Sequence, residues 1–212
     1  MPYNASDVWK MVPPRNRESI RRDTYLLRKK LNLSQTPYFP IVRFIEHVLP
    51  LSDPSFSFEI AEDEELRGVH AEYVPHSNTI RVKASVYEAA TNDNWWARST
   101  LAHELGHYYY HDEKNVRYAK LDFGQKIPPD YDPERQANIF AAELLAPIHL
   151  LKGMTEKQIS REFGVSNAIA SRQILALERV NKRQERKHQA KKRRPSRNST
   201  ANRHSNYLLW DR

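Results

Sequence analysis

The segment STLAHELGHYYYHDE, residues 99–113, contains the pattern H-E-x-x-H at His103, Glu104 and His107. On an α-helix, residues i and i+4 lie about 40° apart around the axis, so the two histidines share one face. The opposite side carries Leu101, Leu105 and Tyr108. The pattern therefore predicts a helix with one core face and one chemical face, on which two imidazoles can hold a single metal ion. The alternative is an ordinary polar stripe that faces solvent.

The residues around the two histidines suggest further roles. Glu104 projects about 100° from His103, where a carboxylate reaches a metal-bound water rather than the metal, so we interpret it as a general base. His111 lies roughly 12 Å along the axis from His103, which is too far for both to bind one ion. We interpret His111 as a residue that supports the ligands or lines the cleft, with a surface histidine as the alternative. Tyr110 and His111 are both candidates for stabilising an oxyanion.

A third metal ligand is expected from the helix predicted in DPERQANIFAAELLAP, residues 132–147. At about 100° per residue, Glu134 and Asn138 project into the sector of the apolar residues, whereas Glu143 projects almost opposite. A carboxylate in line with a buried stripe requires a cation or hydrogen-bond donors. We therefore predict that Glu134 is the third ligand and that Glu143 faces solvent. The alternative for Glu134 is a favourable interaction with the helix dipole.

Periodicity along the chain predicts an α+β fold. Apolar residues alternate around residues 56–60, 69–73 and 79–83, which indicates a small, mostly antiparallel sheet whose last two strands form a hairpin. The strand at 79–83 precedes the H-E-x-x-H helix and is a candidate to pair with an extended peptide. Helices are predicted at residues 18–31, from Pro40, and through the H-E-x-x-H pattern with Asp93 or Asn94 as the cap. Further helices are predicted after Asp132, which can act as an N-cap before Pro133, and as two short helices around Gly164, where Thr155 and Gln158 form a capping box.

Two segments of the chain resemble the ImmA/IrrE family of cytoplasmic metallopeptidases. RSTLAHELGHYYYH and, 27 residues after His107, ERQANIFAAELLAP are similar to that family's H-E-x-x-H helix and its E-x-x-A-N-x-F-A motif. The resemblance places His103, His107 and Glu134 on the metal ligands and Glu104 on the general base, with Asn138 on a flanking position. It implies Zn²⁺, or another divalent ion such as Mn²⁺, and a helix-turn-helix repressor as the protein substrate. The long basic tail and the amino-terminal arm depart from the family's pattern.

The carboxy-terminal part is the most basic part of the chain. Residues 181–212 carry eleven Lys and Arg against two acidic residues, a net +9, so the other 180 residues sum to −1. Such a run predicts disorder and salt-dependent, nonspecific affinity for nucleic acid, with a purely solubilising tail as the alternative. The densest cluster is Lys191, Lys192, Arg193 and Arg194. For the preceding helical pair we favour packing on the peptidase, or docking of the repressor, over DNA reading.

The expected organisation is a flexible arm (1–17), a metallopeptidase domain (18–151), a helix-turn-helix-like segment (152–180) and a basic disordered tail (181–212). The chain has no cysteine, no amino-terminal apolar segment and no run as long as a membrane span, so we expect a soluble, cytoplasmic protein. The expected function is a zinc-dependent endopeptidase that cleaves a transcriptional repressor. The alternative is a DNA- or partner-binding regulator, in a toxin–antitoxin or mobile-element context, whose metal site is not catalytic.

Overall fold

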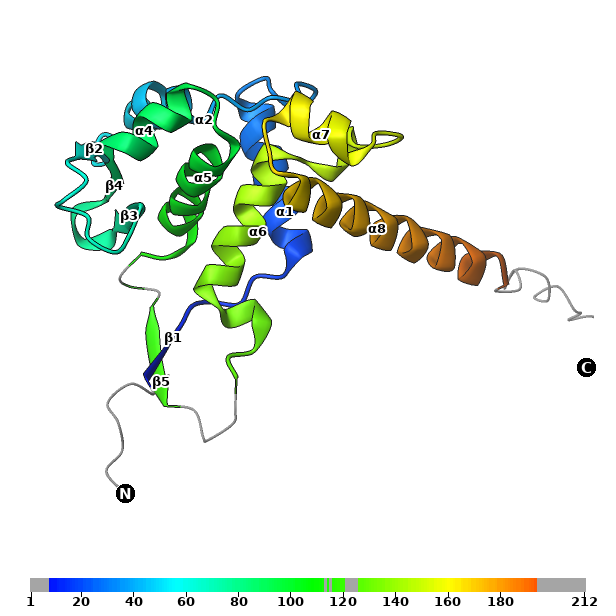
Figure 1. Cartoon of the computed structure of the whole chain (residues 1–212). Helices are drawn as coiled ribbons and strands as arrows, with labels where there is room; N and C mark the ends of the chain where they lie inside the picture. The colour runs from blue at the N-terminus through cyan, green and yellow to red at the C-terminus, as the bar shows by residue number, and fades with distance from the viewer. Residues whose placement is uncertain (1–7, 113, 115, 121–125, 194–212) are drawn as a thin grey trace, which may run out of the picture. The chain divides into compact units, whose positions relative to one another are not determined.

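The fold is α+β, as the sequence predicts, in a computed structural model shown in Figure 1. The model describes residues 8–112, 114, 116–120 and 126–193. The helices are α1 (Arg17–Lys30), α2 (Ile41–Arg43), α3 (Leu49–Ser52), α4 (Ala84–Thr91), α5 (Trp95–Tyr110), α6 (Pro133–Leu145), α7 (Glu156–Phe163) and α8 (Asn167–Arg193), with a π-helical turn, Phe44–Val48, between α2 and α3. The strands are β1 (Val8–Met11), β2 (Ser57–Ala61), β3 (Ala71–Val74), β4 (Thr79–Lys83) and β5 (Arg117–Lys120).

Three strands form a mixed sheet in the order β2-β4-β3. The antiparallel β3–β4 pair, with Ala71 opposite Val82, is the predicted hairpin. β2 runs parallel to β4, with Ser57 opposite Thr79, so the sheet is mixed rather than mostly antiparallel. The sequence pattern did not reveal this because alternation reports which face of a strand is buried, not the direction of its neighbour.

The amino-terminal segment is paired with the rest of the chain. β1 forms an antiparallel ribbon with β5, in which Val8 lies opposite Lys120. After β1, the amides of Val12 and Arg15 donate to the carbonyls of Tyr131 and Asp130. The expectation of a loose arm is therefore wrong from residue 8 onward, because these backbone hydrogen bonds join it to the segment that leads into α6.

The helix α5 lies between the sheet and α6, and α6 in turn packs against α1 (Figure 1). Asn94 caps α5 by accepting from the amides of Trp96 and Ala97, and Asp132 caps α6, which begins at Pro133. Both caps agree with the sequence prediction. The contact between α5 and α6 includes Gly106, Ala137 and Phe140, and the residues Ala137 and Phe140 are buried.

The chain divides into two compact units, residues 1–177 and 178–212. The first unit contains α7, which begins with the predicted capping box of Thr155 and Gln158, and the first turns of α8. Gln173 of α8 is fully buried and donates to the carbonyls of Ala142 and Ala146 at the end of α6. The first turns of α8 therefore pack against the end of α6, the helix that carries Glu134.

The second unit begins within α8, which continues to Arg193. The expectation of disorder is wrong for residues 181–193, because they extend a helix that already has packed first turns and so needs no new nucleation. Residues 194–212 of the expected tail, Arg194 among them, lie outside the described residues. Among the helices that the structure describes, none is long and apolar enough to span a bilayer.

Candidate metal centre

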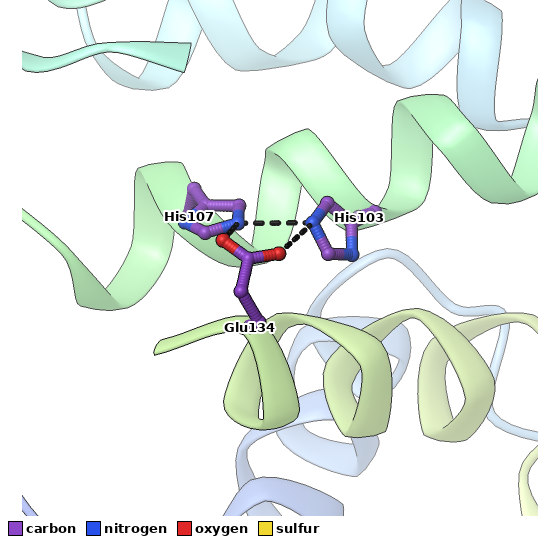
Figure 2. Close-up of side chains that lie close together, drawn as sticks. All are labelled: His103, His107 and Glu134. Atoms are coloured by element: carbon purple, nitrogen blue, oxygen red, sulfur yellow. Dashed lines mark hydrogen bonds and ion pairs between the residues drawn. The ribbon is translucent and has the colours of Figure 1, made fainter. Parts of the chain in front are cut away.

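Two imidazoles of α5 face the same space on its chemical side. The Nε2 atoms of His103 and His107 are 3.0 Å apart (Figure 2). The i, i+4 spacing stacks the two rings on one face of the helix. The opposite face is buried, as predicted, so the helix cannot rotate to present the histidines elsewhere without exposing its core residues.

Glu134, in the first turn of α6, points toward these two nitrogens (Figure 2). Its Oε2 lies 3.2 Å from Nε2 of His103, and its Oε1 lies 3.5 Å from Nε2 of His107. Two ligands bonded to one tetrahedral zinc ion at about 2.0–2.1 Å would lie roughly 3.3–3.4 Å apart. Two neutral ring nitrogens and one carboxylate are also the donor set of catalytic zinc sites, so these residues fit a divalent ion in a zincin-like arrangement.

The burial of the two glutamates of α6 is the reverse of what their positions in the sequence predict. The side chain of Glu134 is 65% exposed, because it lies at the open end of the apolar stripe rather than within it. The prediction that Glu143 faces solvent is wrong, since its side chain is 0% exposed. Arg17 and Arg21 of α1 bind its two carboxylate oxygens at 2.9–3.1 Å. Helical projection places residues around one axis but does not indicate that a second helix supplies cations.

A close backbone contact brings α5 and α6 together between the ligands. A Cβ atom added to Gly106 would lie 2.9 Å from Cα of Ala137 and 3.2 Å from Cβ of Phe140. The first distance is shorter than real Cβ contacts, so a larger residue at this position would force the backbone of α6 to shift. The contact holds the first turn of α6 within reach of the histidines. The sequence analysis missed this role, although a glycine inside a predicted helix is a signal of close packing.

The charges of the three ligands are coupled. Hydrogen bonds from His103 and His107 lower the pKa of Glu134 below its usual range. Burial alone would lower the pKa of His103, but its hydrogen bond to Glu134 and the negative charge of Glu104 outweigh this effect and raise it. The cluster therefore attracts positive charge, which a proton or a metal ion can supply.

Glu104 lies beside the ligands in a nearly dry environment. The residue is 9% exposed, and its Oε2 accepts a hydrogen bond of 2.9 Å from the amide of Tyr73 in β3. Burial raises the pKa of this carboxyl, partly opposed by the two histidines. A carboxylate with a raised pKa, held by one oxygen, is suited to accept and return a proton.

His111 is buried behind His107 rather than on the surface. It is 1% exposed, and its Nδ1 lies 2.8 Å from Nδ1 of His107. Its Nε2 lies 3.2 Å from Oε1 of Gln136, a buried residue of α6 that the sequence analysis did not consider. Burial lowers the pKa of His111 to about 4. No local pattern links residues 111 and 136, since only the packing of α5 on α6 brings them together.

The remaining candidates lie in different environments. The hydroxyl of Tyr110 donates to Asp23 of α1 at 3.1 Å, so the interpretation of Tyr110 as an oxyanion donor is wrong. Its direction differs from the prediction because Asp23 of α1 accepts this hydrogen bond. Asn138 lies one turn after Glu134, donates to the Glu134 carbonyl at 2.7 Å and contributes a hydrogen bond that raises the pKa of His103.

Two further candidates concern substrate and nucleic acid. β4 is the central strand of its sheet, so the expectation that it pairs with a peptide is wrong, because β2 and β3 already occupy both of its edges. The basic residues Lys191, Lys192 and Arg193 lie at the end of α8, away in sequence from the ligand helices.

These observations define the class of site: a helix with an H-E-x-x-H pattern whose two histidines meet a glutamate from a following helix. Comparison with protein families agrees, since the model of the IrrE N-terminal-like domain, Peptidase_M78, matches residues 65–175. The match covers more than half of the 212 residues and includes all three ligands. The chain therefore belongs to the ImmA/IrrE family of metallopeptidases. A comparison with curated proteins gave no significant match.

Proposed function

We propose that the protein is a zinc-dependent endopeptidase that cleaves a helix-turn-helix transcriptional repressor and so relieves repression. The observation that carries the catalytic part is the position of Glu104, which is buried next to His103, His107 and Glu134. A purely structural metal site requires ligands but no additional, desolvated carboxylate beside them. The repressor as substrate is supported by membership of the family.

The metal ligands and Glu104 have separate roles in the proposed hydrolysis of a peptide bond. His103, His107 and Glu134 would hold the ion, which when bound polarises a peptide carbonyl and lowers the pKa of a water molecule. Glu104 would take a proton from that water, which its raised pKa favours, and would deliver it to the nitrogen of the leaving amine. The Tyr73 amide holds Oε2 of Glu104 and leaves Oε1 free for this exchange.

β3 is the strand best placed to bind an extended substrate. In the described part of the chain, β3 pairs only with β4, and the Tyr73 amide on its other edge points toward Glu104. A peptide that adds to this edge would gain main-chain hydrogen bonds and lie alongside α5. We therefore propose that the substrate pairs with β3 rather than with β4.

The test of this function is Glu104→Gln, which keeps the size of the side chain but removes its basicity. We expect the variant to bind zinc like the wild type and to lose at least about 100-fold in cleavage rate, as is usual for loss of a general base. The assay uses helix-turn-helix repressors encoded beside the gene, with products mapped by mass spectrometry. Glu64→Gln, an exposed change, is the control. Unchanged cleavage by Glu104→Gln would overturn the mechanism, and metal binding without cleavage of any candidate would favour a regulator with a non-catalytic site.

A second activity is supported by the end of α8. Residues 181–190 are all exposed, and residues 178–193 carry eight Lys and Arg against two acidic residues. We propose that this helix binds nucleic acid through phosphates, without sequence preference.

Truncation after residue 180 separates this activity from the metal centre. We expect the truncated protein to retain zinc binding and to lose affinity for a labelled random DNA duplex, measured by fluorescence anisotropy at 50 and 200 mM salt. Replacing Lys191, Lys192, Arg193 and Arg194 by Gln should weaken binding. It should also reduce the slope of log affinity against log salt concentration by the equivalent of up to about four phosphate contacts. Equal affinity of the full-length and truncated proteins would exclude the proposal.

A further inference from the structure

We infer that Gln136 and His111 are positioning residues that hold His107 in the tautomer required for metal binding. The inference rests on the metal site proposed above and adds residues behind it. Gln136 contacts His111, and His111 contacts His107, so three side chains from two helices form one hydrogen-bonded chain that ends at a metal ligand. We call this chain the 136–111–107 relay.

The orientation of the Gln136 amide is determined by its neighbours. Its Nε2 lies 2.9 Å from the carbonyl oxygen of Pro13 and 2.7 Å from that of Asp130. A carbonyl oxygen can only accept a hydrogen bond, so the NH₂ group of Gln136 must face these two residues. Its Oε1, which can only accept, then faces Nε2 of His111 at 3.2 Å.

This orientation fixes the proton on His111. Because Oε1 of Gln136 accepts, Nε2 of His111 must carry the hydrogen. His111 is 1% exposed and its two hydrogen-bond partners, His107 and Gln136, are both uncharged when His107 binds a metal, so a buried cation here would lack compensation. A neutral imidazole has one N–H, and Nδ1 of His111 is therefore an acceptor.

The proton on His107 follows from the same logic. Its Nδ1 lies 2.8 Å from the accepting Nδ1 of His111, so His107 must donate from Nδ1. When a metal is bound, its Nε2 therefore provides the lone pair, and this atom is the one that faces His103 and Glu134. Ligand histidines in metal sites usually donate their second ring nitrogen to a fixed partner, which sets tautomer and ring orientation. In this protein the partner is another histidine, oriented by a glutamine.

The relay also connects the metal centre to the amino-terminal segment. Pro13 follows β1, and Asp130 lies in the turn before α6, so the carbonyls that orient Gln136 belong to the segments joined by the hydrogen bonds of Val12 and Arg15. The backbone of residues 12–15 therefore contributes to the geometry of His107 although none of its side chains approaches the ligands.

The direct test is the tautomer of His107, read from ¹⁵N chemical shifts and two-bond ¹H–¹⁵N couplings of histidine-labelled, zinc-loaded protein. We expect wild-type His107 to carry its proton on Nδ1, and Gln136→Met and His111→Leu to show a mixture of tautomers. The zinc dissociation constant should rise about 10–100-fold in both variants, as expected for loss of a residue that orients a metal ligand.

Gln173→Met is the matched control. Gln173 is also fully buried and also donates its amide to two carbonyls, but these lie at the end of α6, and its Oε1 accepts from Arg17 of α1. We expect it to lose comparable stability without changing the His107 tautomer or the zinc affinity. The inference is overturned if wild-type His107 carries its proton on Nε2, or if Gln136→Met and Gln173→Met affect zinc binding equally. The tautomer is read without any substrate, so failure of the proposed peptidase activity would leave this result readable.

Discussion

Two buried glutamates illustrate how surroundings assign different roles to the same side chain. Glu104 is desolvated beside one backbone amide, and its pKa is raised, so it can exchange a proton. Glu143 is fully buried, but the guanidinium groups of Arg17 and Arg21 compensate its charge. The first arrangement is suited to catalysis, and the second joins α1 to α6.

The Arg21–Glu143 pair should contribute strongly to stability. Arg21→Met removes two hydrogen bonds, of 2.9 and 3.0 Å, from a fully buried carboxylate and leaves only Arg17 as a cation. We expect the free energy of unfolding to fall by about 3 kcal/mol, the lower end for a broken buried ion pair. Urea denaturation measures this change. Arg22→Met, an exposed change on the same helix, should stay within about 0.5 kcal/mol. Equal losses in both variants would contradict the assignment.

Asp53 gives a prediction about pH. Hydrogen bonds from Ser55, Tyr108 and Asn78 lower its pKa to about 2, from 3.8 when unperturbed. A depressed pKa in the folded state means that Asp53 stabilises the fold above pH 3.8 and loses this effect as the pH falls toward 2. Asp53→Asn should therefore lower the melting temperature most at pH 7 and less at pH 3. A difference that does not change between these pH values would refute this explanation.

At the scale of elements, the distance between α5 and α6 determines whether the three ligands meet. Gly106→Ala tests this distance. Alanine favours a helix over glycine by about 1 kcal/mol, but overpacking typically costs about 1–3 kcal/mol. The added methyl would meet the backbone of Ala137, which cannot move as a side chain does, so we expect a net loss of stability and weaker zinc binding.

Calorimetry and zinc competition measure the two effects of Gly106→Ala. Gly153→Ala is a useful comparison, because nothing lies within 4 Å of its added Cβ, although its φ of +78° also strains an alanine. It should lose stability through the backbone alone and keep wild-type zinc affinity. If Gly106→Ala stabilises the protein and leaves zinc binding normal, the distance between α5 and α6 does not determine whether the ligands meet.

Local sequence patterns predicted the individual helices and strands better than they predicted which of these elements lie next to one another. The caps at Asn94 and Asp132, the capping box of α7 and the β3–β4 hairpin depend on residues close in sequence. The parallel β2–β4 pair and the β1–β5 ribbon join segments far apart, and alternation carries no information about such partners. The same limit applies to the site: H-E-x-x-H was visible, whereas Gln136 behind His111 depends on packing between helices.

At the scale of the whole molecule, a ligand that binds only the folded chain must stabilise it. Zinc at about 1000 times its dissociation constant should add roughly 4 kcal/mol, which corresponds to a rise in melting temperature of about 8–16 °C for a chain of this size. His103→Asn and Glu134→Gln should abolish the rise, and Glu64→Gln should not. Differential scanning fluorimetry after treatment with a chelator and stepwise addition of zinc measures it. A rise of the same size in all variants would place the bound zinc elsewhere.

The backbone contact at Gly106 also affects which metal ions the site can select. Main-chain atoms cannot adjust by rotating a bond, so the triangle formed by two ring nitrogens and one carboxylate has little freedom to widen. Calcium requires six to eight oxygen donors at about 2.3–2.6 Å, and magnesium retains most of its hydration shell. Both ions should be rejected in favour of transition metals with high affinity for imidazole, so selectivity follows from the donor set and from the spacing of two helices.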